Sequence, residues 1–287
     1  MSVGTMTTCT MTAGERTTGR RPGRTVAPDR YRFGGLVRSE LTKLRTVRSS
    51  AWTLGLTLAL GVGLSALAAS ETRLHWSSMS IGERLSFDPT RLSLIGIFFG
   101  QLTVGVLGIL VMSAEYGTGT IRATLAAAPR RTGVLAAKSV VFAAVALVVS
   151  EVSAFAGYFV GQALLSAPAT HTTIASPGAL RAVAGSGLYL CVLGLLALGL
   201  ATLLRHTAGA IGAFIGILFV LPLVTAALPV TLAADIGRFL PADIGQSIVS
   251  LHAGPRSFAP LPSLLLLCAY AAAALVGGAI SLVRRDA

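Results

Sequence analysis

The stretch LSLIGIFFGQLTVGVLGILVM, residues Leu92 to Met112, decides the fold class, because it contains no charged side chain. A helix of about 20 apolar residues crosses the roughly 30 Å hydrocarbon layer of a bilayer. Five further apolar runs are long enough to do the same, and they lie near residues 51–69, 134–165, 180–204, 208–228 and 261–283. None alternates polar and apolar residues as a barrel strand does. The sequence therefore predicts an all-α integral membrane protein with six transmembrane helices.

Composition agrees with a membrane protein and excludes several other classes. The chain is 53% hydrophobic and 12% charged, whereas about 25% of the residues of a soluble domain are charged. Its three cysteines and four histidines show no metal-ligand spacing, so no metal or other cofactor is expected on this chain. A formal net charge of +12 would suggest nucleic acid in a soluble protein. Here the basic residues lie between the apolar runs, so no nucleic-acid partner is expected.

The basic residues also predict the orientation. With the N-terminus in the cytosol, 17 of the 23 lysines and arginines lie on the cytosolic side and six on the other, which follows the positive-inside rule. Residues 1–33 lack the apolar core of a signal peptide and are expected to form a disordered basic tail. We expect a multi-pass protein of the plasma (inner) membrane, with a membrane domain at 51–283 and cytosolic ends that include residues 284–287.

The segment FGGLVRSELTKLRTVRSS precedes the first run and predicts an amphipathic helix over residues 34–50. At about 100° per residue its apolar residues share one arc, with Lys43 on one border and Arg38 and Arg45 on the other. The apolar residues of this arc are Phe33, Val37, Leu41, Leu44 and Val47. We expect this helix to lie in the cytosolic interface of the lipid bilayer, with its basic side chains toward anionic headgroups. The alternative is an ordinary basic flank of the first span.

The stretch SAEYGTGTIRATLAAAPRR, Ser113 to Arg131, separates the second and third runs. The two glycines of YGTGT disfavour continuation of the second span, and either threonine of this motif can cap a new helix. Good helix formers follow from Ile121 to Ala128, and Pro129 ends the helix. The sequence predicts a short cytosolic helix between spans two and three. The alternative is a connecting loop whose arginines obey the charge rule.

These residues resemble the E…GT-x-R…L…PR…K pattern that follows the second span in ABC type-2 transporter permeases. The residues that carry the resemblance are Glu115, Gly119, Thr120, Arg122, Leu125, Pro129, Arg130 and Lys138. The pre-span RSELTKLRTVRSSAWT is similar to the N-terminal connecting segment of that family. FLPADIGQSI, residues 239–248, is similar to its extracellular segment before the last span.

The resemblance implies that the helix at 121–128 is a coupling helix that docks against an ATP-binding cassette ATPase. It also implies a second permease subunit, identical or different, and export as the direction of transport. The implied ATPase-coupling interface consists of Glu115, Gly119, Thr120, Arg122, Leu125, Pro129 and Arg130. The pre-span helix is implied to contribute to this contact through Arg38, Leu41, Leu44 and Arg45.

The chain has no phosphate-binding G-x-x-x-x-G-K-[ST] loop, and its nearest string, GVLAAKS, lacks the second glycine and the spacing. ATP and Mg²⁺ are therefore expected on a separate ATPase subunit, and this chain is not expected to be an enzyme. The predicted function is the transmembrane permease subunit of an ATP-driven exporter. The alternatives are an ion-coupled secondary transporter, which would normally show several intramembrane charges and paired broken helices, and a non-transporting membrane anchor or sensor subunit.

Glu151 lies in the middle of the third run. An ionised carboxylate costs about 2.5 to 3.5 kcal/mol there. It either lines the substrate path or the seam of a permease dimer, or makes a structural hydrogen bond to Ser150, Ser153 or a neighbouring helix.

Small residues and prolines predict local details of the spans. Three GxxxG spacings begin at Gly96, Gly157 and Gly212 and indicate close helix packing, with a permease dimerisation motif as the alternative. Pro222 and Pro229 are expected to kink the fifth span. The segment at 231–260 contains either a short re-entrant helix or a simple external loop.

Overall fold

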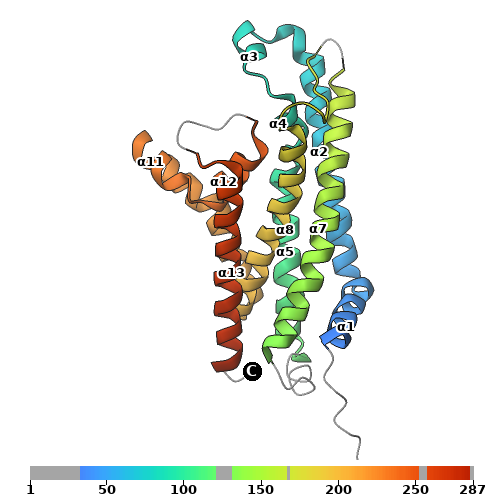
Figure 1. Cartoon of the computed structure of the whole chain (residues 1–287), viewed down its shortest axis with the longest axis vertical. Coiled ribbons are helices and arrows are strands. Elements are labelled where there is room, and N and C mark those ends of the chain that lie inside the picture. Colours follow the sequence, from blue (N-terminus) through green and yellow to red (C-terminus); the bar gives the residue numbers. More distant parts are fainter. Residues whose placement is uncertain (1–32, 121–130, 167–168, 252–256, 285–287) are drawn as a thin grey trace, which may run out of the picture. The chain divides into compact units, whose positions relative to one another are not determined.

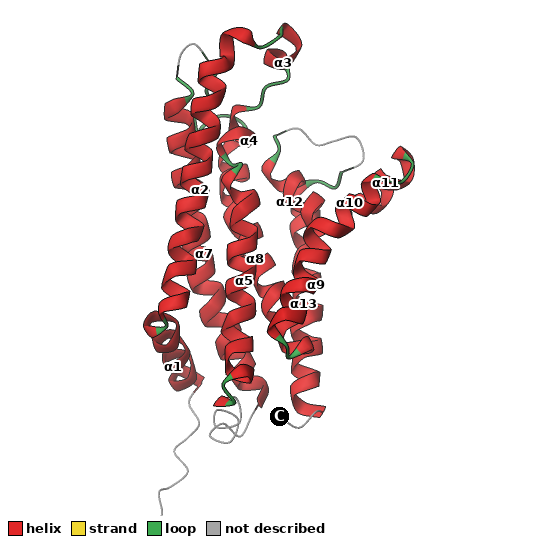
Figure 2. Ribbon diagram, turned by 180° about the vertical axis from the view of Figure 1, so that it is seen from behind, coloured by secondary structure: helices red, strands yellow, loops and turns green. Residues whose placement is uncertain are grey.

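Six helices of the computed structural model are long and apolar enough to cross a membrane. The structure describes residues 33–120, 131–166, 169–251 and 257–284, and within these residues it contains helices and no strand. The six candidate spans are Arg48–Ser78, Pro89–Gly117, Arg131–Leu164, Ala179–Leu204, Thr207–Ala226 and Pro260–Arg284. The coarse prediction of an all-helical protein with six apolar spans is confirmed (Figures 1 and 2).

Helix α2 (Arg48–His75) is longer than the apolar run that predicts it. It continues past Ala69 through Glu71 and Arg73, and its 28 residues extend about 42 Å at 1.5 Å per residue. An established helix gains one hydrogen bond for each added residue whatever the polarity of the side chain, so it does not stop where the apolar run stops. The 3₁₀ helix η1 (Trp76–Ser78) and the short helix α3 (Ile81–Leu85) follow.

Helix α5 (Gly96–Gly117) forms most of the second span and follows the short helix α4 (Pro89–Ser93). Asp88 caps α4, because its Oδ1 accepts hydrogen bonds from the backbone nitrogens of Thr90 at 2.9 Å and Arg91 at 3.1 Å. Helix α5 ends at Gly117, and Gly119 has a φ of +70°, a conformation that glycine adopts at little cost. The second span therefore stops at the two glycines.

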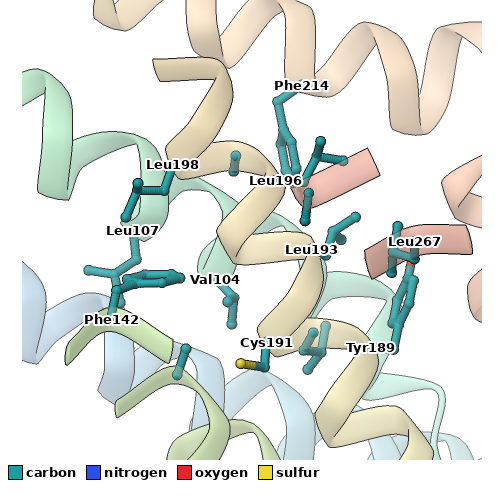
Figure 3. Close-up of a cluster of buried hydrophobic side chains, with 14 of the residues drawn as sticks. Val104, Leu107, Phe142, Tyr189, Cys191, Leu193, Leu196, Leu198, Phe214 and Leu267 are labelled. Atoms are coloured by element: carbon teal, nitrogen blue, oxygen red, sulfur yellow. The ribbon is translucent and has the colours of Figure 1, made fainter. Parts of the chain in front are cut away.

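Helix α8 (Ala179–Leu204) is the central helix of the bundle, and most of its residues are buried. It packs against α5, α7 (Arg131–Leu164), α9 (Thr207–Ile215) and α13 (Pro260–Arg284). Glycines on α8 allow this close packing. A Cβ on Gly194 would lie 2.8 Å from the ring of Phe142. Figure 3 shows the resulting core around α8, which contains Val104, Leu107, Phe142, Tyr189, Cys191, Leu193, Leu196, Leu198, Phe214 and Leu267.

Helices α2, α5 and α7 also approach closely. The hydroxyls of Thr57 and Thr103 lie 2.7 Å apart, which joins α2 to α5. Of the predicted GxxxG glycines, Gly96 and Gly157 face the backbone of Gly61, whereas nothing lies within 4 Å of a Cβ built on Gly212 or Gly216. The first two spacings therefore serve packing within this chain, and the third does not.

The fifth span is interrupted. Helix α9 passes into the π-helix η2 (Gly216–Val220) and then into α10 (Leu221–Ala226). Pro222 has no N–H to donate to the carbonyl of Leu218, so the regular ladder cannot continue and the helix widens there. Helices α10 and α11 (Val230–Gly237) lean away from the bundle (Figure 2). The predicted kink at Pro222 coincides with this interruption, whereas the prediction for Pro229 is wrong, because Pro229 lies beyond the fifth span as the N-cap of α11.

Within the segment predicted as a re-entrant helix or an external loop, the structure has α11 and α12 (Pro241–Val249). Helix α12 packs on α8 and α13, and the Ser247 hydroxyl donates a hydrogen bond of 2.8 Å to the Ser263 hydroxyl of α13. We call the end of the bundle that holds α1 (Phe33–Thr46) and Arg284 the α1 end (Figure 1). Helices α3 and α12 lie toward the opposite end (Figure 1).

Candidate functional site

Helix α1 turns an acidic residue toward the bundle. It packs against α7 and touches the start of α2, and Glu40 is its buried residue, with 5% of its surface exposed. Leu36, Val37 and Leu44 are half-buried beside it. An ionised carboxylate among apolar side chains needs opposite charges within reach, because an unpaired buried ion costs several kcal/mol.

Those opposite charges come from two lysines, and a second glutamate completes the group. Lys138 of α7 is 3% exposed, and its Nζ lies 2.6 Å from Oε2 of Glu40 and 3.0 Å from Oε1 of Glu115. The Nζ of Lys43 lies 2.7 Å from Oε1 of Glu40 and 2.8 Å from Oε1 of Glu115. We call Glu40, Lys43, Glu115 and Lys138 the four-charge network.

The network is electrically balanced, because two carboxylates meet two ammonium groups. Burial disfavours the charge of Lys43, but hydrogen bonds and attraction to Glu115 and Glu40 outweigh burial and raise the pKa of this side chain. The Lys43 side chain remains 42% exposed, so water screens its share of the attraction. Lys138 is the fully enclosed cation and forms the centre of the network.

The network joins three parts of the chain that are distant in sequence. Glu115 lies in the last turn of α5, just before that helix ends at Gly117, and Lys138 lies near the start of α7. Helix α5 therefore ends, and helix α7 begins, beside buried charges. Oε2 of Glu115 is buried and has no hydrogen-bond partner among the described residues.

The predicted coupling residues fall into two groups. Glu115 is 8% exposed and lies in the network. Gly119 and Thr120 follow it on the exposed surface, where the hydroxyls of Thr118 and Thr120 lie 2.9 Å apart. The predicted helix at 121–128 lies outside the described residues, and so do Arg122, Leu125, Pro129 and Arg130.

The predicted residues of the pre-span helix lie on two different faces of α1. Arg38 and Arg45 are exposed, whereas Leu41 and Leu44 are half-buried. Sequence reasoning missed Glu40 and gave Lys43 only a border position. One signal was available: at 100° per residue Glu40 falls between Leu36 and Leu44, inside the apolar arc. A charge in that position indicates a buried partner.

Two arginines at the α1 end of the bundle bind the last turn of α13. Arg131 donates a hydrogen bond of 3.0 Å to the carbonyl of Leu282, and Arg205 donates one of 2.7 Å to the carbonyl of Ser281. The last carbonyls of a helix have no partner within it, so these bonds hold the end of α13 to α7 and α8. The guanidinium of Arg205 also lies 5.7 Å from the ring centroid of Tyr116.

Glu151 is placed apart from the four-charge network, on α7 against α8. A Cβ on Gly187 would lie 2.6 and 2.7 Å from its two carboxylate oxygens, so the carboxyl group fills the space that this glycine leaves. Oε2 is buried without a hydrogen-bond partner among the described residues. Ser153 donates instead to the carbonyl of Thr57, and the Ser150 hydroxyl has no partner among these residues either. The predicted hydrogen bond from Glu151 to Ser150 or Ser153 is therefore not made, and a place on the substrate path or dimer seam stays a prediction.

Within the described residues, no group of three or more His, Cys, Asp or Glu side chains is arranged to hold a metal ion. Comparison with protein-family models and with curated proteins gives no match for this chain.

Proposed function

We propose that this chain is the transmembrane permease subunit of an ATP-driven exporter and works with a separate cassette ATPase and a second permease subunit. The ATPase binds ATP and Mg²⁺, and it docks on the segment between α5 and α7. ATP binding changes the relative stability of two arrangements of the permease and so shifts their populations. The chain carries the substrate across the plasma membrane and performs no bond chemistry.

The observation that carries the proposal is the four-charge network. It ties α1, the end of α5 and the start of α7 together through four contacts of 2.6 to 3.0 Å. Separating buried opposite charges by even a few ångström is costly, so these three elements move as one. A force applied to the connecting segment, or to the outer face of α1, is then delivered to two spans at once.

The charge distribution supports a cytosolic position for the α1 end. Arg38, Arg45 and Arg48 are exposed there, and Glu40 is turned inward. Basic residues next to the spans favour the cytosolic side, where an ATPase has access to ATP. We propose the same orientation for both termini.

The proposal is tested by coexpressing the chain with a cassette ATPase encoded beside it and isolating the complex in lipid nanodiscs. We expect the ATPase to copurify and its ATP hydrolysis to depend on the permease. Gly119→Pro combined with Arg122→Glu should remove both effects and leave membrane insertion intact. Arg181→Gln at the opposite end, where Arg181 is exposed, is the matched control and should change neither.

Three outcomes decide among the functions. Unchanged copurification of the Gly119→Pro, Arg122→Glu variant contradicts docking at this segment. Flux in reconstituted vesicles that follows an ion gradient without any ATPase supports a secondary transporter instead. Stable recruitment of the ATPase without any flux supports a membrane anchor or sensor subunit.

A further inference from the structure

A cavity of about 930 Å³ lies toward the end of the bundle opposite to α1. Its walls come from α3, α4 and the first turns of α5, from η2 and α10, and from α12, with Tyr189 of α8 at its inner side. The lining residues come from four separate parts of the sequence, 83–101, 189, 218–223 and 242–249, and Figure 2 shows the arrangement of the helices that hold them. The volume is in the range of small-molecule sites, which is about 300 to 1,000 Å³.

One part of the wall is aromatic. Phe98 and Phe99 of α5 and Phe219 of η2 line the cavity. The ring of Phe98 makes edge-to-face contacts with both others, with centroid separations of 5.5 Å in each case. Pro222 interrupts the regular backbone hydrogen bonds of the fifth span. Phe219 therefore lies on the widened π-helical turn η2. The faces of these rings attract apolar groups and, through their quadrupoles, cations.

The rest of the lining is net negative. Three carboxylates, from Glu83, Asp88 and Asp243, meet a single guanidinium, that of Arg91. Arg91 donates a hydrogen bond of 3.2 Å to the neutral amide of Gln246, and Asp243 forms no ion pair among the described residues. Hydrogen bonds from the backbone and hydroxyl of Ser80 lower the pKa of Glu83, whereas burial raises the pKa of Asp243. The cavity is thus acidic in a chain whose net charge is +12.

A buried amide adds a hydrogen-bond donor. Gln101 lines the cavity although only 3% of its surface is exposed. Its Oε1 accepts a hydrogen bond of 2.8 Å from the Tyr189 hydroxyl, while its Nε2 has no partner among the described residues. A buried donor without a partner is costly, and an acceptor such as a carbonyl or ether on a bound molecule would satisfy it.

We propose that this cavity binds amphipathic organic cations, with the aromatic body of the ligand against Phe98, Phe99 and Phe219 and its positive charge toward Asp243 and Glu83. A carbonyl or ether of the ligand accepts from Gln101. Binding is a property of this chain alone and stands whether or not an ATPase couples to it. Only the role of such cations as exported cargo rests on the proposed function.

The test compares two probes of one shape and opposite charge, tetraphenylphosphonium and tetraphenylborate. Equilibrium binding is measured on the chain in lipid nanodiscs without ATPase, and binding to empty nanodiscs is subtracted. We expect saturable binding of the phosphonium and at least about tenfold weaker binding of the borate, since the two ions are close in shape and size and opposite in charge. Equal affinity for the two ions would overturn the proposal.

Variants identify the residues. Asp243→Asn should weaken phosphonium binding about three- to tenfold, the range expected for one partly screened charge, and should not weaken borate binding. Phe219→Ala should weaken both probes, because both stack on the ring. Asp235→Asn on α11, outside this cavity, is the matched control and should change neither. Unchanged phosphonium affinity in Asp243→Asn would exclude this cavity as the cation site.

The amide is tested with rhodamine 6G, a cation that carries an ester carbonyl. Gln101→Leu should weaken rhodamine binding more than phosphonium binding, because the phosphonium has no acceptor. If Gln101→Leu weakened the binding of both probes equally, a hydrogen-bond acceptor would not be a required feature of the ligand. Size-exclusion profiles of each variant confirm that the protein used is folded.

Discussion

Lys138 and Glu40 are 98 positions apart in the chain, yet Nζ of Lys138 lies 2.6 Å from Oε2 of Glu40, and both residues are at most 5% exposed. The contact fastens α1, which precedes the first span, to the start of the third span. Such a pair need not stabilise the fold relative to an apolar one, but removing one partner leaves the other buried and charged. The contact is therefore specific: α1 is held at one position on α7.

Replacement of the central cation should be severe, and a compensating change should restore stability. Lys138→Met leaves two buried carboxylates to a single lysine and is expected to cost about 3 to 5 kcal/mol. Adding Glu40→Gln leaves Lys43 paired with Glu115, so much of the loss should return. Thermal unfolding in detergent, followed by size-exclusion fluorescence, measures both variants. A double variant no more stable than Lys138→Met alone would contradict charge balance as the organising principle.

The raised pKa of Lys43 predicts how α1 responds to alkali. When the folded-state pKa of a base is raised, its contribution to the folding free energy is fully present below the ordinary pKa, 10.5 for Lys43, and is lost as the pH rises through the folded-state value. The position of α1 on α7 should therefore be constant from about pH 7 to 9.5, and should loosen only above 10.5.

Spin labels at Arg38→Cys and Ala136→Cys, both exposed positions, report the distance between α1 and α7 after the native cysteines are replaced by serine. A change in that distance between pH 7 and 9 would contradict the assignment. In the Lys43→Met variant this alkaline transition should be absent.

Two neighbouring glycines should respond oppositely to alanine. Nothing lies within 4 Å of a Cβ on either Gly117 or Gly119, so packing does not distinguish them. Gly119 has a φ of +70°, and alanine there should cost about 1 kcal/mol of folding free energy. Gly117 is helical, and alanine there should be neutral or stabilise by up to about 1 kcal/mol. Equal thermal stabilities of the two variants would show that the backbone at 119 does not need glycine.

Glycines within the spans should differ according to what faces them. Gly194→Ala places a methyl group 2.8 Å from the ring of Phe142 and from Val104, and is expected to cost about 1 to 3 kcal/mol through overpacking. Gly212→Ala meets open space and should be tolerated. Midpoints of thermal unfolding compare the two, and a Gly194→Ala midpoint at or above that of Gly212→Ala would contradict the packing around α8.

The proposed orientation predicts the side of each loop. A reporter fused after Ser80, the N-cap of α3, should lie outside the cytosol, because α3 is at the end of the bundle opposite to α1. Alkaline phosphatase and green fluorescent protein fusions give complementary readouts of this position. Fluorescence without phosphatase activity would reverse the proposed orientation of the whole protein.

The sequence predicted the parts of the fold that depend on neighbouring residues. Six apolar runs are visible directly because a span requires length and apolarity and little else. The end of α5 was visible in Gly117 and Gly119, and the break in the fifth span in Pro222. The capping box of α3 was not predicted, although its signal is equally local, since Ser80 and Glu83 have the S-x-x-E spacing.

The candidate site depended on distant pairing and was predicted only in part. Glu115 was named only through the family resemblance of the residues around it, and its coupling role stays a prediction. Its partners Lys43 and Lys138 become its partners only when three helices meet. Glu40 lies on an arc that is apolar by periodicity, so a simple amphipathic pattern assigned that face to lipid. In the structure this face of α1 packs against α7. The charge of Glu40 inside the apolar arc was the sign that the face contacts protein and not lipid.

The separation of Glu40 and Lys138 also sets an order of events during synthesis. Glu40 leaves the ribosome 98 residues before its partner, which at about 5 to 20 residues per second is roughly 5 to 20 s. During that interval the carboxylate of Glu40 has no Lys138 with which to pair. The contact that holds α1 on α7 can therefore form only after the third apolar helix has been synthesised.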